Sequence, residues 1–422
     1  MILVHAADLH LGSPLGGLGE HADLPVRRIR QAPMRAFERL ADECERLQAE
    51  LLVIAGDLFD VDADLATMRE AAQVLERICR AGTRVVTIRG NHDAQSRMQR
   101  RLPAIDGLHQ LPVDAAATVV FEELGVAVHG RGFDTPRVLD AIVTEYPAAV
   151  PGLLNVGVLH TSLAGAPGHD PYAPCTLDDL IALGYDYWAL GHVHVRQVLH
   201  DAPWIVYAGN TQGRDIGETG ARGATIVEFA EGAVTATPYH VDLDDVRWSR
   251  LPVELDADET AQELLERMSR LLAELVQREP DNVHIVRVEV GGRGRAHDEL
   301  AAEPAAWRSR LHDAAYHVST DALYLEQVRF RTAPQLPDAS TLLVREDAIG
   351  DIARVLLGDD VEPTPIDGDA FSGLERKLAP LQDGVSDELL APVTVEELRT
   401  AREALVGRLL VAHADAAGGS ER

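Results

Sequence analysis

The side chains of this sequence that are best suited to chemistry lie in five short segments. These segments are "DLH" at 8–10, "GDLFD" at 56–60, "GNHD" at 90–93, "VGVLH" at 156–160 and "GHVH" at 191–194. The groups in them that can hold a metal ion or transfer a proton are Asp8, His10, Asp57, Asn91, His92, His160, His192 and His194. Nitrogen and oxygen donors without a thiolate suit Mn²⁺, Fe²⁺, Zn²⁺ or Mg²⁺. Their number exceeds the ligands of one tetrahedral ion, so two ions that share a carboxylate fit better.

Each segment follows an apolar run that is typical of a buried strand. The runs cover residues 2–6, 51–55, 84–88, 153–159 and 187–190. Asp8 and His10 are two residues apart, so an extended chain turns both side chains to one face. His192 and His194 have the same spacing. Because open α/β sheets place their sites at the carboxyl ends of strands, we expect the segments to meet in one site.

The remaining strand and helix signals predict the fold class. Further apolar runs occur at 118–121, 125–129 and 204–207, and helical spacing occurs at 33–49 and 63–81. This alternation is typical of a layered α/β domain. We expect that domain to cover residues 1–250.

The last part of the chain changes character. Residues 251–332 predict a small α+β module of strands and helices. Residues 333–422 predict a Pro-rich linker and a helical tail, with helices near 341–357 and 394–412 and a disordered end. Amphipathic helices in such a tail could dock on a partner protein.

Composition narrows the classes of protein that fit. No stretch of the 422 residues approaches the roughly 18 apolar residues that a membrane helix needs, and the start lacks a signal-peptide pattern. Cys44, Cys79 and Cys175 are widely spaced, which is typical of reduced thiols and favours a cytoplasmic location. The net charge of −29 disfavours attraction of nucleic acid to the whole surface. Because Lys377 is the single lysine, a local basic patch would be built of arginine.

In their order and spacing, the motifs D-x-H, G-D, G-N-H-D, a lone His and G-H-x-H resemble the calcineurin-like metallophosphoesterase superfamily. The resemblance implies a layered β-sandwich flanked by helices, with two divalent metal ions, of which Mn²⁺ is the first expectation. It implies one ion on Asp8, His10, Asp57 and His194. It implies the second on Asp57, Asn91, His160 and His192, with Asp57 as the bridge. By the same resemblance, His92 is no ligand and helps the leaving group to depart.

This arrangement suits the cleavage of a phosphodiester. Two cations neutralise its oxygens and lower the pKa of a bridging water, so that hydroxide can attack phosphorus near neutral pH. Proton donation by His92 to the departing oxygen would add roughly 10²–10⁴-fold.

Longer stretches such as "HAADLHLGSPL" and "YAGNTQGRDIGETGARG" resemble the YhaO branch of bacterial DNA-repair exonucleases, which is similar to SbcD. The resemblance is strong over 1–250 and looser over 251–332, where the family carries a capping domain. It implies DNA as substrate and an SMC-like coiled-coil ATPase as partner, bound through C-terminal helices. It also implies a possible homodimer through helices near 63–81 and 94–102. Asp60 stands where some relatives carry a histidine.

Candidate DNA contacts are arginines beside the metal motifs and polar residues after a later strand. They are Arg89, Arg97, Arg100, Arg101, Asn210 and Arg214. A second arginine group, Arg27, Arg28, Arg30 and Arg35, lies in "PVRRIRQAPMRAFERL".

Two other functions remain open from the sequence. The acidic charge favours a small-molecule phosphoesterase that hydrolyses a nucleotide or a pyrophosphate. The helical tail favours an interaction subunit that mainly tethers the ATPase.

Overall fold

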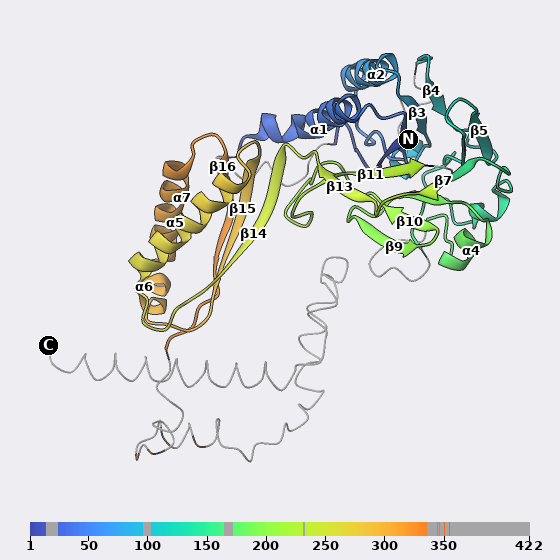
Figure 1. Ribbon diagram of the computed structural model, residues 1–422. Helices are drawn as coiled ribbons and strands as arrows, with labels where there is room; N and C mark the ends of the chain where they lie inside the picture. Colours follow the sequence, from blue (N-terminus) through green and yellow to red (C-terminus); the bar gives the residue numbers. More distant parts are fainter. Residues whose placement is uncertain are drawn as a thin grey trace. The chain divides into compact units, whose positions relative to one another are not determined.

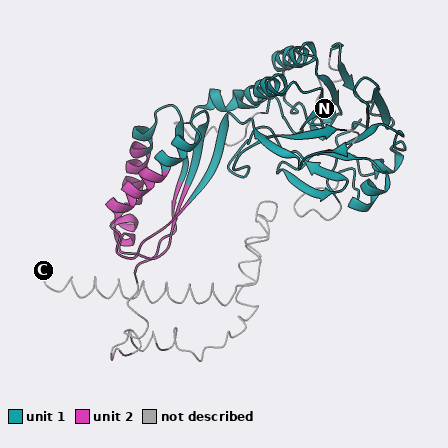
Figure 2. Cartoon of the chain, in the orientation of Figure 1, with its two compact units in different colours: residues 1–251, 272–287, 315–327 teal, residues 252–271, 288–314, 328–422 magenta. Residues whose placement is uncertain are grey.

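The computed structural model describes residues 1–13, 24–95, 103–163, 172–230 and 233–335, and single residues at 344, 346, 350 and 354 (Figure 1). The chain divides into two compact units (Figure 2). Unit 1 comprises 1–251, 272–287 and 315–327, and unit 2 comprises 252–271, 288–314 and 328–422. Apart from the four single residues, the predicted helices at 341–357 and 394–412 lie outside the described residues. No helix among the described residues is long and apolar enough to cross a membrane.

Unit 1 contains two sheets. The first has the order β12-β11-β1-β2-β3-β4, with β13 also paired to β11. Its strands are β1 (Ile2–Ala6), β2 (Leu51–Ile54), β3 (Arg84–Thr87), β4 (Leu108–Gln110), β11 (Gly223–Ala230), β12 (Ala233–Val234) and β13 (Tyr239–Asp242). Strands β1 to β4 are parallel, whereas β11 runs antiparallel to β1. The carboxyl ends of β1, β2 and β3 therefore lie side by side.

The second sheet has the order β5-β6-β7-β8-β10-β9. Its strands are β5 (Ala117–Phe121), β6 (Val126–Gly130), β7 (Leu154–His160), β8 (Tyr187–Gly191), β9 (Gln197–Asp201) and β10 (Trp204–Tyr207). Strands β6, β7, β8 and β10 are parallel. This places the carboxyl ends of β7 and β8 next to each other.

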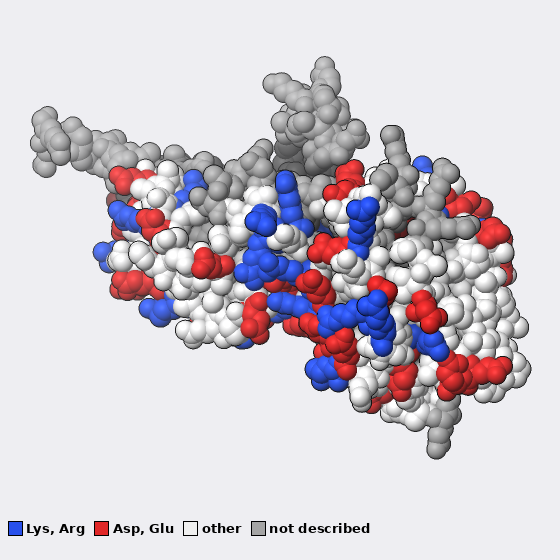
Figure 3. All heavy atoms as spheres, turned by 90° about the horizontal axis from the view of Figure 1, so that it is seen from above, with Lys and Arg blue, Asp and Glu red and all other residues white. Residues whose placement is uncertain are grey.

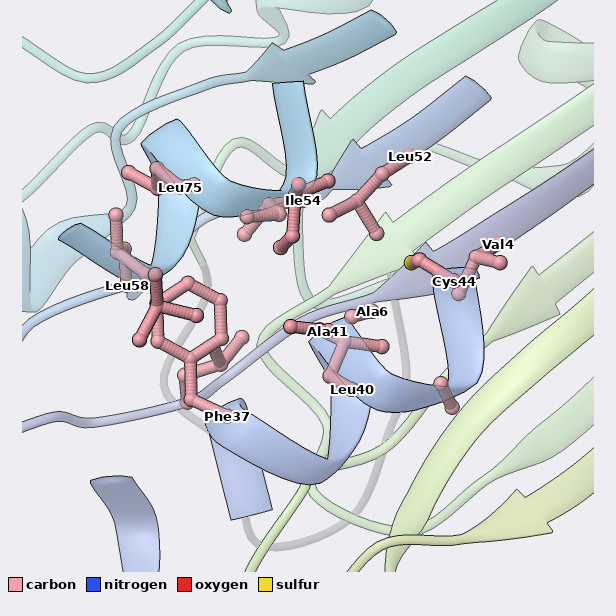
Figure 4. Close-up of a cluster of buried hydrophobic side chains, with 14 of the residues drawn as sticks. Val4, Ala6, Phe37, Leu40, Ala41, Cys44, Leu52, Ile54, Leu58 and Leu75 are labelled. Atoms are coloured by element: carbon pink, nitrogen blue, oxygen red, sulfur yellow. The ribbon is translucent and has the colours of Figure 1, made fainter. Parts of the chain in front are cut away.

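The two sheets pack face to face, and helices cover their outer faces. Leu3, Val53 and Val86 of the first sheet pack with residues of β6, β7 and β8 in one buried cluster. Alternate residues such as Val4 and Ile54 point the other way, onto α1 (Val26–Leu47) and α2 (Leu65–Arg80) (Figure 4). Helix α4 (Leu177–Ala182) and the short helix η2 (Ile142–Glu145) pack on the second sheet. These four layers confirm the predicted layered α/β sandwich.

One boundary differs clearly from the sequence prediction. Helix α1 begins at Val26 rather than at Pro33, and Pro33 lies inside it. Proline removes one backbone donor from a helix interior. Ile29, Ala32, Pro33 and Ala36 are all buried, so packing of the first turns compensates for the lost hydrogen bond.

The chain after residue 245 adds a third sheet with the order β14-β15-β16. Its strands are β14 (Val246–Glu254), β15 (Val283–Gly291) and β16 (Leu323–Phe330), and the helices between them are α5 (Ala261–Arg278), α6 (His297–Ala302) and α7 (Pro304–Val318).

Candidate metal centre

The predicted ligands follow five strands of the two sheets in unit 1. Asp8 and His10 follow β1, Asp57 follows β2, and Asn91 begins the short helix α3 (Asn91–Gln95) after β3. From the second sheet, His160 ends β7, and His192 and His194 follow β8. Parallel strands that neighbour each other bring these ends together.

The first group consists of Asp8, His10 and His194, whose donor atoms all lie within 4.8 Å of one another. Nε2 of His10 and Nε2 of His194 are 3.2 Å apart. Nε2 of His10 also lies 3.9 Å from Oδ2 of Asp57. The structure thus places together the four residues of the first predicted ligand set.

A second group consists of Asp8, Asp57 and His160, again within 4.8 Å. Nε2 of His160 lies 3.4 Å from Oδ2 of Asp57 and 2.9 Å from Oδ1 of Asn91. The His192 ring centroid is 5.2 Å from that of His160, and the His192 backbone N–H donates to the Asp8 carboxylate. All seven predicted ligands therefore gather around Asp57 and Asp8.

Hydrogen bonds on the outer nitrogens orient two of the imidazoles. Nδ1 of His160 lies 2.9 Å from the Ala55 carbonyl, which can only accept, so Nδ1 carries the proton. Nδ1 of His194 lies 2.7 Å from Oε1 of Glu218. In both residues Nε2 faces the centre, 2.9 Å from Oδ1 of Asn91 in His160 and 3.2 Å from Nε2 of His10 in His194. Histidine ligands of metal ions are commonly held in this way.

The backbone around the ligands is strained. Six non-glycine residues among the described ones have positive φ, and four of these are predicted ligands: Asp8 (51°), His10 (44°), Asp57 (49°) and His192 (98°). A positive φ costs free energy in residues that carry a Cβ. Such strain persists only where the surroundings fix it, and it concentrates at functional sites.

Two glycines of the motifs are required by close packing. A Cβ on Gly90 would lie 2.2 Å from Oδ1 of Asp57, and one on Gly56 would lie 2.5 Å from Nδ1 of His160. Gly90 has no positive φ, so its role is to give space to Asp57 rather than to permit an unusual turn.

The electrostatics of the centre favour a cation. Burial lowers the pKa of His10, so its imidazole is neutral and can act as a ligand. Burial also opposes a charge on His160, but the charge of Asp57 outweighs it and raises the pKa of His160 to about 9. Burial disfavours ionised Asp57 too, yet His160 and His10 hold the pKa of that carboxyl well below its usual range. Buried carboxylates that draw positive charge from their neighbours suit divalent metal ions.

His92 is partly exposed, as His194 is. Its side chain is 31% exposed, compared with 21% for that of His194 and 1% for that of His10. Its Nδ1 lies 3.3 Å from Oδ1 of Asp60, and its backbone N–H donates to Asp57. Burial lowers the pKa of His92, but the hydrogen bond to Asp60 and the charges of both aspartates outweigh it, so the net shift is upward.

Asp60 and Glu218 contact the centre, but neither was predicted as a site residue. Oδ2 of Asp60 lies 3.5 Å from Nδ1 of His10, so this buried carboxylate touches both His10 and His92. The signal for Asp60 was its place in "GDLFD", three residues after Asp57. Glu218 has no comparable signal, because it lies 24 residues from His194 in the chain.

The candidate DNA contacts have different surroundings in the structure, and three of them lie outside the described residues. Arg214 donates through Nε and Nη2 to Glu218, and its charge acts on His10 and His92. Asn210 is buried and its amide donates to Glu218, so its side chain is part of the support of the centre. Arg89 donates to the Asp93 carbonyl. Arg97, Arg100 and Arg101 lie outside the described residues, as does most of 94–102.

Comparison with known proteins agrees with this geometry. Residues 1–196 match the family model described as calcineurin-like phosphoesterase. Residues 248–333 match the one described as metallophosphoesterase YhaO, middle domain. The chain therefore carries a calcineurin-like phosphoesterase domain over residues 1–196, followed by a YhaO middle domain over residues 248–333. This confirms the resemblance found in the sequence.

Its relatives include named proteins of bacteria and archaea. "Uncharacterized metallophosphoesterase YhaO" of Bacillus subtilis (strain 168) is 31% identical over 60% of this chain. This match spans only 63% of that relative's own length. "DNA double-strand break repair protein Mre11" of Methanopyrus kandleri is 27% identical over 69% of this chain and 68% of its own length. A subunit of the nuclease SbcCD of Escherichia coli (strain K12) is 22% identical over 68% of this chain and 85% of its own.

Proposed function

We propose that this protein is a metal-dependent phosphodiesterase that cleaves DNA as a repair-type exonuclease or endonuclease. The observation that carries the proposal is the convergence of seven nitrogen and oxygen donors, Asp8 and Asp57 among them, with the partly exposed His92 beside them. The names of two relatives, a double-strand break repair protein and a component of a nuclease, favour DNA over other phosphodiesters.

The donors divide into two overlapping sets. Asp8, His10, Asp57 and His194 would hold one divalent ion, and Asp57, Asn91, His160 and His192 would hold the other. Mn²⁺ is our first candidate because carboxylate, amide and imidazole donors suit it. Such ions supply charge neutralisation at the phosphoryl oxygens and activation of water. The protein itself fixes the donors, through the hydrogen bonds behind His160 and His194.

His92 is the proton donor in this proposal. Its Nδ1 is held on Asp60, which leaves Nε2 to donate to the departing oxygen. Asp60 also stabilises the charged imidazole, so that His92 carries a proton at neutral pH more often than an isolated histidine does. Arg214, braced by Glu218, adds positive charge on the same side of the centre.

The wider assembly follows from the same proposal. Residues 1–250 would form the nuclease domain and residues 251–332 the capping domain. Residues 333–422 would bind an SMC-like coiled-coil ATPase, and a homodimer could form through α2. We propose a cytoplasmic location, which agrees with three free cysteines, two of them buried.

Cleavage of end-labelled duplex and single-stranded DNA in Mn²⁺ tests the substrate. Wild type is compared with Asp57→Ala, and bis-p-nitrophenyl phosphate serves as a generic diester. We expect wild type to shorten DNA and Asp57→Ala to spare both substrates. If wild type hydrolyses the generic diester or a mononucleotide but leaves DNA intact, the small-molecule phosphoesterase replaces the nuclease. The acidic net charge of −29 is the feature that favours this alternative.

A further inference from the structure

A group of arginines lies along the first half of α1 and includes none of the predicted metal ligands. It comprises Arg27, Arg28, Arg35 and Arg39, with Gln31 between them, and we refer to it as the α1 arginine surface. Figure 3 looks down on the side where α1 lies in Figure 1, and it shows basic side chains gathered among acidic ones. Arg27, Gln31 and Arg35 are exposed. They help to line an open hollow of about 540 Å³, together with Pro25, Val26 and Arg28, and none of these lining residues is acidic.

Three of the arginines share one carboxylate. Asp245 accepts from Arg28 at 3.2 Å and from Arg39 at 3.2 Å, and it lies 3.5 Å from Arg35. Its side chain is only 3% exposed, so almost none of the carboxylate is left to face solvent. One negative charge against three positive charges leaves an excess of two, and the exposed Arg27 adds a third. Counted over these four arginines and Asp245, the net charge is +3, on a protein whose net charge is −29.

The same aspartate connects this surface to the metal centre. The backbone N–H of Asp245 donates to Oε1 of Gln212, and the Gln212 amide donates to the Val246 carbonyl. The indole of Trp248 donates to the Gly213 carbonyl. Gln212 and Gly213 belong to the loop that presents Arg214 and Glu218 to His194. These hydrogen bonds thus connect the segment that carries Asp245 with the loop that contacts His194.

We propose that the α1 arginine surface binds backbone phosphates of a DNA strand whose scissile diester lies at the metal centre. This inference rests on the proposed nuclease function and adds a binding surface to it. Guanidinium groups match phosphate oxygens in geometry, and their partial neutralisation by Asp245 still leaves charge for an anion. A surface of this kind supplies affinity without reading sequence, because every nucleotide carries the same phosphate.

The test removes two arginines that contribute least to the fold. Arg27 is exposed, and Arg35 has the longest of the three contacts to Asp245. The double variant Arg27→Gln/Arg35→Gln leaves Arg28 and Arg39 on that carboxylate. The control Arg46→Gln/Arg80→Gln removes the same charge from exposed pairs with Glu43 and Glu76. DNA binding is measured by fluorescence anisotropy in a His92→Ala background with Mn²⁺, over a series of salt concentrations.

We expect the double variant to bind DNA roughly ten- to fifty-fold more weakly than the control at about 0.1 M salt. Its slope of log affinity against log salt should be smaller by about two, because two phosphate contacts are lost. Hydrolysis of bis-p-nitrophenyl phosphate, measured with His92 intact, should match the control. If wild type cuts DNA and both variants bind it equally, this inference is overturned and the nuclease function stands. If wild type neither binds nor cuts DNA, the proposed function fails and the surface assignment fails with it.

Discussion

The metal centre and the α1 arginine surface both concentrate charge, but they hold it in different ways. The centre is largely buried. Its predicted ligands are fixed by strained backbone and by close packing against Gly56 and Gly90, where a Cβ would clash. The arginine surface is partly exposed, and side-chain contacts to Asp245 arrange it. Buried polar groups need fixed positions, because a buried group without its partner costs free energy and a displaced site residue no longer performs its role. Long arginine side chains can reach a phosphate from several positions, so the exact placement of each arginine on the helix is less constrained.

Among variants that leave both regions folded, loss of His92, the proposed proton donor, should have the largest effect on activity. We expect His92→Ala to lower kcat on DNA roughly 10²–10⁴-fold, because the departing sugar oxygen then receives no proton from the protein. The effect on bis-p-nitrophenyl phosphate should be much smaller, because p-nitrophenolate leaves without a proton. Calorimetric titration with Mn²⁺ should give the same affinity as wild type. DNA binding should also be unchanged. A large loss of metal affinity in this variant would instead make His92 a ligand.

Weaker metal binding should follow when the support of His194 is removed. Although burial opposes ionisation of Glu218, hydrogen bonds from His194 and Arg214 hold the pKa of that carboxyl below its usual range. We expect Glu218→Gln to reduce Mn²⁺ affinity roughly 10–100-fold, since an amide orients and polarises the imidazole less well.

The matched control for this change is Glu326→Gln. Glu326 is similarly enclosed and pairs with Arg287, far from the ligands in the chain. It should lower stability to a similar extent without altering metal affinity. Equal metal affinity in both variants would show that Glu218 serves only the fold.

The difference between the two regions also explains what the sequence could predict. Strands β1, β2, β3, β7 and β8 were expected within one or two residues, because each is a short apolar run before a motif. The motifs identified the seven donors that the structure brings together. Their contacts with Asp60 and Glu218 were not expected, since such side chains follow no period and reach the centre only through folding. Asp245 could not be linked to Arg28, because 217 residues separate them in the chain.

The pH dependence of cleavage should distinguish proton donation from phosphate binding. Asp60 favours the charged form of His92, so protonated His92 is present below its raised pKa and is lost as pH rises through it. Replacing Asp60 by Asn removes that negative charge and lowers the pKa of His92. The alkaline decline in kcat, about tenfold per pH unit, should therefore begin at lower pH in Asp60→Asn than in wild type.

Two controls accompany this pH profile. Saturating Mn²⁺ at each pH is needed because Asp60 also touches His10. DNA binding should not change over the same range, since arginine stays protonated. An alkaline limb at the same pH in both proteins would contradict the role given to Asp60.

The smallest effects are expected from replacing Asp245, which should lower the stability of the fold and tighten DNA binding. We expect Asp245→Asn to lower the free energy of unfolding by about 1–3 kcal/mol, because Arg28, Arg35 and Arg39 lose a charged acceptor. The same change removes a negative charge from the arginine surface, so DNA should bind about two- to fivefold more tightly. Urea denaturation and anisotropy measure the two quantities. Asp42→Asn is the control, because Asp42 forms an exposed pair with Arg77. If Asp245→Asn weakened DNA binding, the arginines would require Asp245 to hold them in place, and the surface would depend on fixed geometry as the metal centre does.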